Sequence, residues 1–274
     1  MLPLLLALGC TPEPPPPRLC NGLPELCGRR FDEVAVAMTH NAMSSEDAGF
    51  WPPNQDHGVD QQLADGVRGF MLDVHPYEGE AWLCHGECGL GRTRLAEGLA
   101  AYSAFFATHP DDVLVLMLES YVNPAWVEAA FEEAGLAQRA AVQAPDAPWP
   151  TLTELLDGGT PLVVFTQDEG GDAPWLLAGY RDFVWDTPYA ARTPEDLSCA
   201  PLRGDPSRPI FLLNHFLSAP IALTELAEQV NHEPFLSDRI HQCSAQAGQR
   251  VDWVAVDFYG IGDVLAAVER LNRE

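Results

Sequence analysis

Two histidines and three oxygen-bearing side chains give this sequence its clearest chemical signal. His40 and His85 each follow a short apolar run, and so do Asp73 and Glu119, while Asn41 comes directly after His40. Apolar runs that are bounded by turn signals are typical of buried strands. Because the carboxyl ends of parallel strands meet at one edge of a sheet, we expect these five side chains to share one site.

The residue types predict proton transfer beside a hard cation. An unperturbed imidazole titrates near neutral pH, so two histidines can act as general base and general acid. Asn41, Asp73 and Glu119 offer only oxygen ligands, which suit Ca²⁺ or Mg²⁺ better than zinc. A cation that offsets phosphate charge beside two proton-transferring histidines fits the cleavage of a phosphodiester.

The elements that must position these residues alternate along the chain. Helical spacing of apolar residues predicts helices at 94–108, 125–141, 151–157 and 261–272. Strands are expected near 33–39, 67–74, 81–84, 112–119, 161–166, 182–185, 209–215 and 252–258. Eight strands with intervening helices predict an α/β fold, a parallel sheet closed into a TIM (β/α)8 barrel. The sequence holds no internal repeat, so we expect one domain over 20–274, after a leader and tether at 1–19.

Four further residues are candidates for the site. Asp257 ends the last strand and adjoins the first strand in a closed barrel, so we expect it to accept a hydrogen bond from His40 and fix its tautomer. The candidate substrate contacts are His75, Arg68 and His215. For Arg68 the alternative is an ion pair at the base of the barrel, and for His215 it is a hydrogen-bonded histidine at the rim.

Several segments, taken in order, resemble a known family. THNAM, the pair Asn54-Gln55, QQLADGVRGFMLDVH and WLCHGEC are similar to the X-type catalytic region of phosphatidylinositol-specific phospholipase C. The resemblance is to secreted phospholipase C-like phosphodiesterases of plants, fungi and bacteria, and continues through VVFTQDEGG, FLLNHF and CSAQAGQRVDWVAVDFY, over residues 20–260. It implies a distorted TIM barrel, with His40 as general base, His85 as general acid, and Asn41, Asp73 and Glu119 as calcium ligands.

The sequence departs from the family pattern at two positions. Metal-dependent members carry an acidic ligand two residues before the Asp, where this chain has Met71. Metal-independent bacterial members carry an Arg two residues after it, where this chain has His75. Glu119 favours the metal-dependent interpretation, with calcium as the expected cofactor and magnesium as the alternative. A charged His75 would instead replace part of the cation's role.

Composition excludes several classes of function. The formal net charge is −25 at pH 7, and all 15 basic residues are arginines. Without lysine, Schiff-base catalysis and a P-loop are excluded. Without a basic stripe, nucleic acid is not an expected partner. We expect a monomer that acts on a phosphodiester substrate, with a lipid head group as the leading candidate.

The amino terminus predicts export. The run MLPLLLALGC is too short to cross a bilayer and ends in a sequence similar to a bacterial lipoprotein cleavage box, with Cys10 as the acylated residue. The next residues, TPEPPPP, form a stiff and extended tether. We therefore expect a lipoprotein anchored to the membrane through Cys10. The alternative is a secreted protein with an ordinary signal peptide.

Six cysteines remain when Cys10 is set aside. An even number in an exported chain indicates disulfides. Local pairing suggests Cys20–Cys27 and Cys84–Cys88, which leaves Cys199 and Cys243, although six cysteines allow 15 connectivities. A zinc site is disfavoured, because no second cysteine pair has the spacing of zinc ligands.

The leading prediction is a phosphodiesterase of the phospholipase C type, whose first product is a cyclic phosphate. One alternative is a glycerophosphodiester or sphingomyelinase D-type phosphodiesterase, which uses two histidines and a metal but favours an E-x-D pair that Met71 breaks. Another is a non-catalytic cell-surface protein that retains the barrel for binding.

Overall fold

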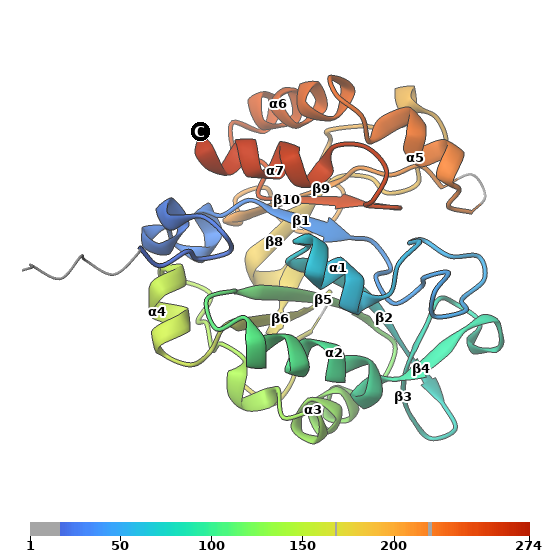
Figure 1. Ribbon diagram of the computed structural model, residues 1–274, viewed down its shortest axis with the longest axis vertical. Coiled ribbons are helices and arrows are strands. Elements are labelled where there is room, and N and C mark those ends of the chain that lie inside the picture. Colours follow the sequence, from blue (N-terminus) through green and yellow to red (C-terminus); the bar gives the residue numbers. More distant parts are fainter. Residues whose placement is uncertain (1–16, 168, 219–220) are drawn as a thin grey trace, which may run out of the picture.

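A curled sheet of eight parallel strands forms the centre of the protein. The computed structural model describes residues 17–167, 169–218 and 221–274 (Figure 1). The strands lie side by side in the order β7-β6-β5-β2-β1-β10-β9-β8. Their bounds are β1 (Val36–Thr39), β2 (Gly69–Tyr77), β5 (Leu114–Ser120), β6 (Leu162–Thr166), β7 (Leu176–Ala178), β8 (Val184–Asp186), β9 (Ile210–Asn214) and β10 (Trp253–Val256). The predicted α/β fold of TIM-barrel type is therefore confirmed.

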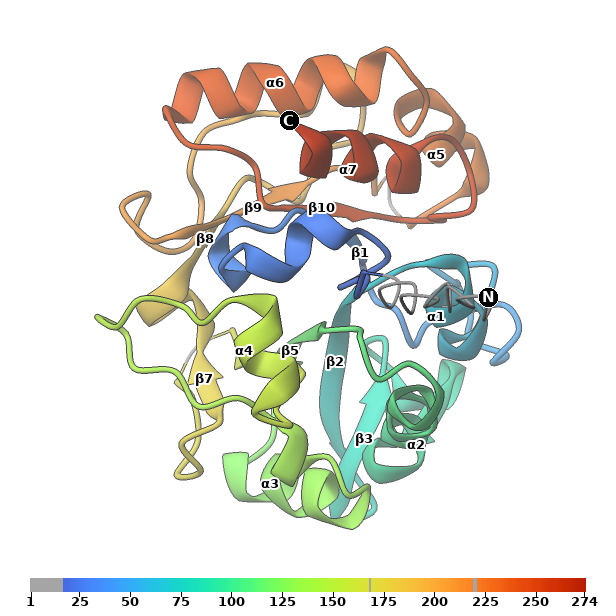
Figure 2. The ribbon, with the colours of Figure 1, turned by 60° about the vertical axis from the view of Figure 1, so that its left-hand side comes forward.

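Seven α-helices accompany the sheet in the described residues. They are α1 (Val59–Asp65), α2 (Leu95–Thr108), α3 (Pro124–Glu133), α4 (Leu152–Asp157), α5 (Thr224–Val230), α6 (Phe235–Ala247) and α7 (Val264–Arg273). Figures 1 and 2 show α6 and α7 on the side of β9 and β10, and α2 and α3 on the opposite side of the barrel.

Local sequence sets several of the helix ends. Asn123 caps α3 through its side chain, and Thr151 forms a capping box with Glu154 at the start of α4. The predicted helix 125–141 ends early, because Gly135 takes a left-handed conformation with φ of 70°. Only a short 3-10 turn, Ala137–Arg139, follows it. Helices α1, α5 and α6 were not predicted.

One predicted barrel strand has a different role. The segment predicted at 81–84 is β3 (Glu80–Cys84), which pairs antiparallel with β2 and with β4 (Arg92–Arg94). Glu78 and Gly79 join β2 to β3, both with positive φ, which is the two-residue turn of a tight hairpin. Parallel neighbours need a far longer connection. The prediction of a barrel strand at 81–84 was wrong, and β7 is the eighth strand instead.

The barrel is open between β7 and β8. Among the described strands no backbone pairing joins these two, which lie on one side of the molecule in Figure 2. The connection between them is a single π-helical turn, Gly179–Phe183. A crossover between paired parallel strands takes about a dozen residues or more, so this turn is too short to build one. The expected complete closure is therefore not reached.

Alternate strand residues fill the inside of the barrel. Met38, Met71, Met117, Phe165 and Trp253 belong to one buried apolar cluster. Their strand neighbours on the other face, such as Phe70, Leu116 and Val254, pack in a second cluster with residues of the helices. This period of two is the alternation expected of strands that are buried on both faces.

All three expected disulfides are present. They join Cys20 to Cys27, Cys84 to Cys88, and Cys199 to Cys243. The last of these ties the segment between β8 and β9 to α6. The predicted lipidation site, Cys10, lies outside the described residues.

Contacts of the folded domain begin before the expected boundary at residue 20. Arg18 forms ion pairs with Asp111 at 2.5 Å and with Asp157 at 2.7 Å. Within the described ranges, no helix combines the length and apolar character needed to cross a membrane.

Candidate active site

A layer of polar side chains closes the carboxyl end of the barrel. Each member follows an interior apolar residue of its strand by two positions, so the alternation of strand side chains directs it to the same interior side. The members are His40, Asp73, Glu119, Gln167, Asp186, Asn214 and Asp257. Four predicted site residues are thus brought to one end of the barrel.

His40 is held from two sides. Its Nδ1 lies 2.8 Å from Oδ1 of Asp257, so the predicted hydrogen bond between these residues is present. Its ring stacks on Phe216, with centroids 3.9 Å apart and planes within 6° of each other. Because a carboxylate accepts the proton on Nδ1, Nε2 is the nitrogen left for a substrate. The His40 side chain is 20% exposed, which leaves it accessible.

Asn54 and Gln55 pin the loop after β1 against the end of β10. Asn54 donates from Nδ2 to Asp257 Oδ1 at 2.9 Å, while the other Asp257 oxygen is buried without a partner in the described residues. Gln55 donates from Nε2 to the carbonyl oxygens of His40 at 2.8 Å and Val256 at 3.1 Å. This pair therefore fixes the relative position of the histidine and its carboxylate.

The backbone turns sharply at both members of the His40–Asp257 pair. The next residues, Asn41 and Phe258, have φ angles of 47° and 49°, in the left-handed region. Asparagine adopts this conformation readily, but a bulky phenylalanine does so rarely. The Phe258 N–H donates to the carbonyl oxygen of Asn54 at 2.8 Å, which helps to hold the turn. Such local strain is common where the surrounding structure has to place a functional group.

His85 reaches the site from the hairpin rather than from a barrel strand. It follows β3 directly, in the small loop that the Cys84–Cys88 disulfide closes. Its Nδ1 lies 3.4 Å from Oγ of the buried Ser44, which donates to the carbonyl oxygen of Pro52 at 3.3 Å. The His85 imidazole also forms a hydrogen bond with the Pro52 carbonyl. In the tautomer that carries the proton on Nδ1, Ser44 accepts from His85. Nε2 of His85 is then free for a substrate.

The two histidines have pKa values shifted in opposite directions. For His40, burial lowers the pKa, but the charges of Asp257, Asp73 and Glu119 outweigh it and raise the pKa above its ordinary value. For His85, burial and then the charge of His40 lower the pKa. The pKa of each histidine is shifted by charges of the polar layer, including Asp257 and Glu119, so both imidazoles lie in the same electrostatic environment.

Asp73 and Glu119 form a pair of neighbouring carboxylates. They are register partners on the adjacent strands β2 and β5. Burial, and then the charge of Glu119, raise the pKa of Asp73 to about 7, against a smaller opposite effect of His40. Glu119 accepts hydrogen bonds from Tyr121 Oη and, at 3.1 Å, from Gln167 Nε2. Asp73 has no such donor among the described residues, so its charge is poorly compensated.

These residues fit a hard divalent cation. Two adjacent carboxylates that repel each other, together with the amide oxygen of Asn41, offer oxygen ligands of the kind that calcium prefers. Among the residues that the structure describes, no three His, Cys, Asp or Glu side chains are grouped to hold a metal ion. Met71, where metal-dependent members carry an acid, is buried in the apolar interior. Water would therefore have to complete the coordination.

The family model PI-PLC X 1 matches residues 26–272, nearly the whole chain. The chain belongs to the PI-PLC X domain family. A PI-PLC X domain-containing protein of Arabidopsis thaliana is 28% identical over 94% of this chain and 64% of its own length. PI-PLC X domain-containing protein 1 of Arthroderma benhamiae is 26% identical over 93% of this chain and 89% of its own length.

A second Arthroderma benhamiae relative is named an uncharacterized secreted protein, and is 25% identical over 94% of this chain and 64% of its own length. The chain thus spans less than two thirds of two of these relatives. Among solved structures, phosphatidylinositol-specific phospholipase C of Staphylococcus aureus has a TM-score of 0.64 and 15% identity, and the match covers 90% of this chain and 94% of that one. At this identity the likeness establishes the fold of the PI-PLC X domain alone.

His75 lies at the entrance to the site of this PI-PLC X domain. It is on β2, two residues beyond Asp73, and its ring stacks on Tyr121 with centroids 4.5 Å apart. Burial lowers its pKa, more than the charges of Glu119 and Glu87 raise it. A lowered pKa leaves the imidazole neutral at neutral pH. This disfavours the hypothesis that a charged His75 replaces a cation.

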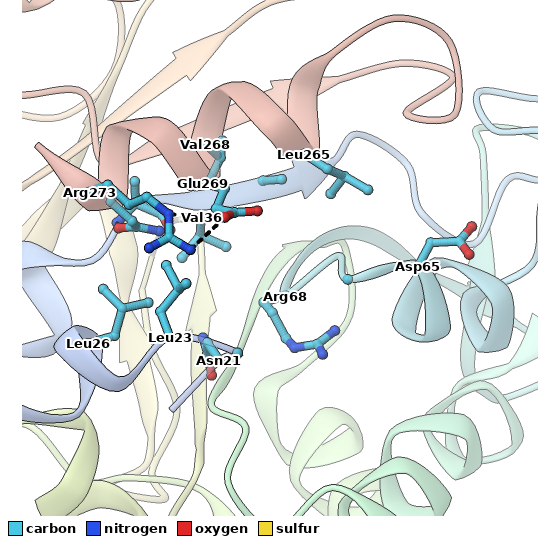
Figure 3. Close-up of a pocket in the computed structure, with 15 residues that line it drawn as sticks. Asn21, Leu23, Leu26, Val36, Asp65, Arg68, Leu265, Val268, Glu269 and Arg273 are labelled. Atoms are coloured by element: carbon cyan, nitrogen blue, oxygen red, sulfur yellow. Dashed lines mark hydrogen bonds and ion pairs between the residues drawn. The ribbon is translucent and has the colours of Figure 1, made fainter. Parts of the chain in front are cut away.

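Arg68 lies at the wrong end of the barrel to contact a substrate at this site. It precedes β2, and its Nε donates to Asp112 Oδ1 at 3.1 Å while Nη1 donates to the Leu63 carbonyl at 2.8 Å. It lines a cavity of about 310 Å³ beside α7 at the amino end of β1 (Figure 3). The expectation of a substrate contact is corrected, because a residue before a barrel strand lies at the opposite face from one after it.

His215 is also not a substrate contact. Its side chain is completely buried, where Nδ1 accepts from Arg239 Nη1 at 3.1 Å and Nε2 donates to the Val230 carbonyl at 2.8 Å. Burial and the charge of Arg239 lower its pKa to about 3. His215 therefore joins β9 to α5 and α6 as a neutral structural residue, and the prediction that it binds substrate was wrong.

Several residues of the polar layer were not predicted from the sequence. Gln167, Asp186 and Asn214 end their strands at interior positions, and Arg203 and Tyr180 contact Asp186. A signal was present for the first three, because each continues the period of two from a buried apolar residue. For Arg203, in an irregular segment between β8 and β9, no local pattern exists.

Proposed function

We propose that this PI-PLC X domain protein cleaves phosphodiesters by the general acid and base chemistry of phospholipase C. The observation that carries the proposal is the arrangement at the carboxyl end of the barrel. There the Asp257-bound imidazole of His40 shares an electrostatic site with His85, beside the carboxylates of Asp73 and Glu119.

The reaction needs a proton acceptor on one side of phosphorus and a proton donor on the other. Nε2 of His40 accepts the proton of a substrate hydroxyl, which attacks phosphorus and forms a new P–O bond. Nε2 of His85 gives a proton to the leaving alcohol oxygen as its P–O bond breaks. In a phosphoinositide the leaving group is diacylglycerol, and the product is a cyclic phosphodiester. The six cysteines that the structure describes are all disulfide-bonded, so none of them is a competing nucleophile.

The protonation states of the free protein must change when substrate binds. A raised pKa at His40 and a lowered pKa at His85 favour a charged base and a neutral acid. The anionic phosphate raises the pKa of the His85 imidazole that it contacts, which restores the acid. Neutralisation of Asp73 and Glu119 would remove their part of the His40 shift and restore the base.

Calcium is the proposed cofactor, with magnesium as the alternative. Asn41, Asp73 and Glu119 would hold it. When bound, a calcium ion lowers the pKa of the attacking hydroxyl and offsets negative charge that develops at phosphorus. The raised pKa of Asp73 supports the proposal, because two partly buried carboxylates at neighbouring positions are stabilised by a positive charge nearby.

The alternative that an observation favours is a binding protein without catalysis. Met71 is buried in the apolar interior where metal-dependent members carry an acid, so one expected ligand is missing. A glycerophosphodiester or sphingomyelinase D-type activity is less well supported, because it requires the acidic pair that Met71 interrupts.

A substrate panel distinguishes these functions. Purified protein is incubated with phosphatidylinositol, phosphatidylcholine, sphingomyelin and glycerophosphodiesters, in calcium or in chelator, and products are followed by phosphorus NMR. A five-membered cyclic phosphate formed first, in calcium only, supports the proposal. Acyclic monoester from the earliest times, with oxygen-18 from water, indicates direct hydrolysis and contradicts it. No turnover of any substrate, with calcium binding retained, favours the binding protein.

We also propose that the protein is exported and held at a membrane by a lipid on Cys10. Three disulfides support export, because they persist in oxidising compartments, and one fungal relative is named a secreted protein. Intact mass of the protein from its native host tests the anchor. An unmodified Cys10 in the exported protein would contradict the proposal of a lipid anchor.

A further inference from the structure

Arg203 closes the barrel where the backbone does not. It comes from the segment between β8 and β9, and its Nε and Nη2 donate to Asp186 Oδ2 at 2.9 Å and 2.5 Å. Its guanidinium lies over the rings of Tyr180 and Tyr189, 4.5 Å from each centroid. Tyr180 belongs to the π-helical turn between the unpaired strands β7 and β8. Arg203 therefore packs against the connection that spans the opening.

The same guanidinium reaches across the opening to β6. Nη1 of Arg203 donates to Oε1 of Gln167 at 3.1 Å. Because an arginine can only donate, Gln167 must present its oxygen to Arg203 and its amide nitrogen to the other side. That nitrogen, Nε2, donates to Oε2 of Glu119 at 3.1 Å. Arg203 thus determines which way the Gln167 amide points, and the amide holds one oxygen of Glu119.

The chain of contacts is anchored at its far end. Asp186 is completely buried, and it accepts from Tyr180 Oη and from Asn214 Nδ2, each at 3.0 Å. Its Oδ1 accepts from the backbone N–H of Arg203 at 2.9 Å. Asp186 accepts from four kinds of donor, so its carboxylate holds the Arg203 guanidinium in one position. The hydrogen bond from Arg203 to Gln167 therefore has a fixed direction.

We propose that Arg203 is a positioning residue that acts through Gln167 to fix the carboxylate of Glu119 as a cation ligand. The inference rests on the proposed function, in which Glu119 binds calcium. A ligand held by donors on its outer side keeps its remaining lone pairs aimed at the cation, and loss of such donors typically weakens metal binding or activity by about 10- to 100-fold. Arg203 itself touches neither the substrate nor the cation in this proposal.

Two variants distinguish a role of Arg203 in positioning Glu119 from a purely structural role in closing the barrel. Gln167→Met has nearly the same length and cannot hydrogen-bond to Glu119, but it leaves the Arg203–Asp186 pair intact. Arg203→Met removes both the pair and the orientation of the amide. Arg181→Met is the matched control, since the exposed Arg181 lies next to Tyr180 on the π-helical turn and, among the described residues, pairs with its neighbour Asp182.

The readouts are calcium affinity by titration calorimetry, turnover, melting temperature and the crystal structures of wild type and Gln167→Met. We expect calcium to bind about 10-fold or more weakly to Gln167→Met and Arg203→Met, with the Glu119 carboxylate displaced and Arg181→Met unchanged. If Gln167→Met keeps both the Glu119 position and the calcium affinity, while Arg203→Met only melts earlier, Arg203 is a structural clamp and the proposal is wrong.

The same experiments distinguish a failure of the proposed enzymatic function from a failure of the positioning role of Arg203. Wild-type protein that binds calcium, responds to the variants as expected and yet cleaves no phosphodiester would disprove the enzymatic function and leave the positioning role standing. Wild-type protein that takes up no calcium would overturn the cation part of the proposal, and the crystallographic position of Glu119 would decide the remainder.

Discussion

Each end of the barrel holds a carboxyl group whose pKa is raised to about 7. Asp73 lies at the carboxyl end and Asp252 at the amino end, and burial is the largest cause of the shift in both. Viewed by pKa alone, the two residues look alike. Their hydrogen-bond partners make them different.

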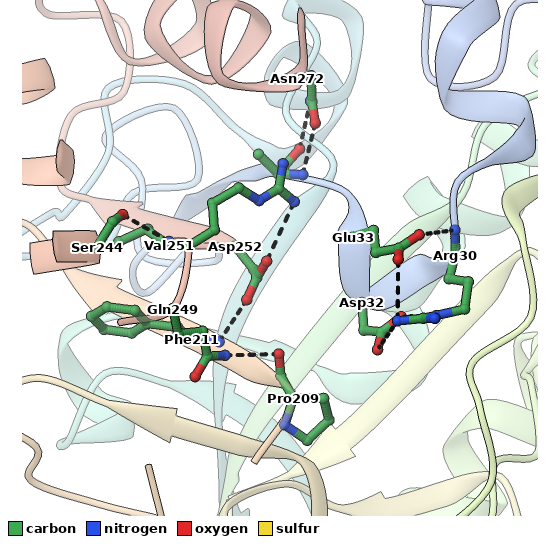
Figure 4. A network of polar contacts seen from close by, with 12 residues as sticks. Arg30, Asp32, Glu33, Pro209, Phe211, Ser244, Gln249, Val251, Asp252 and Asn272 are labelled. Atoms are coloured by element: carbon green, nitrogen blue, oxygen red, sulfur yellow. Dashed lines mark hydrogen bonds and ion pairs between the residues drawn. The ribbon is translucent and has the colours of Figure 1, made fainter. Parts of the chain in front are cut away.

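Asp252 is fully engaged in holding three strands together. Its carboxylate accepts from the backbone N–H of Phe211 at 2.9 Å (Figure 4). It also accepts from Arg250 Nη2 at 3.3 Å. Its carbonyl oxygen accepts from the Val36 N–H at 2.8 Å. Asp252 therefore connects β9, β10 and β1, and each of its carboxylate oxygens accepts a hydrogen bond.

Among the residues with a described position, Asp73 has no comparable partner, and its register neighbour Glu119 is another carboxylate. Glu119 raises its pKa further, and the charge of His40 opposes this shift. The two arginines differ in where their guanidinium groups bond, because Arg68 pairs with Asp112 at the amino end while Arg203 bonds to Asp186 and Gln167 in the polar layer. For these two carboxyl groups, the raised pKa therefore indicates a candidate functional site where the carboxylate also lacks hydrogen-bond donors.

The largest effect that this comparison predicts is at the two histidines. We expect His40→Ala and His85→Ala each to lower phosphodiesterase turnover by at least about 100-fold, because each removes a general acid or base. Melting temperatures should change little. Initial rates and thermal unfolding of each purified variant measure this, and near-native turnover in either one would show that the corresponding histidine is not catalytic.

The second-largest effect is expected at Asp73, which we propose binds the cation and whose charge destabilises the cation-free protein. We expect Asp73→Asn to lower turnover and calcium affinity by about 10-fold or more, since it removes a charged ligand. In chelator the variant should melt at a higher temperature than wild type, because the repulsion from Glu119 is gone. Calorimetry and thermal unfolding with and without calcium test both. A variant that is inactive and also less stable in chelator would mean that Asp73 has a structural role.

At the amino end, Asp252 should affect stability and not turnover. Its folded pKa of about 7 lies above the ordinary 3.8, so its contribution to stability is full below the unfolded value and is lost as pH rises through the folded value. Asp252→Asn resembles the protonated form at every pH. Between pH 5 and pH 8, wild type should therefore lose roughly 2 to 3 kcal/mol more stability than the variant.

Urea unfolding of both proteins at the two pH values measures this difference, and turnover of the variant at pH 7 is the control. Equal pH dependence in the two proteins would contradict the assignment. Lower turnover of Asp252→Asn at unchanged stability would show that this residue at the amino end has a functional role. It would contradict the structural role that we assign to Asp252.

The smallest effect is expected at Arg68. Arg68→Met should leave turnover unchanged and lower the free energy of unfolding by about 1–3 kcal/mol, because the mostly buried Asp112 loses its ion pair. Comparison with Arg203→Met is the informative part. If the two arginine variants affect turnover equally, the difference between the two ends does not hold.

Local sequence determined the strands and much of the site. Apolar runs of strand length located β1, β2, β5, β6, β8, β9 and β10, and a polar residue at the end of a run was enough to select His40, Asp73, Glu119 and Asp257. Close spacing in the sequence suggested two of the disulfides, and the third was the pair of cysteines that remained. These features are short in range, so neighbouring residues along the chain carry the information.

The tertiary structure decided which of these residues meet. The turn at Glu78 and Gly79 folds β3 back on β2, so His85 arrives from a hairpin, and the register of β2 and β5 places Asp73 beside Glu119. The burial of His215 depends on helix α6, far along the chain. Arg203 and Gln167 are 36 residues apart, and no local pattern relates them. Such pairings depend on sheet register and on the path of long connections, and a local pattern of apolar and polar residues does not encode either one.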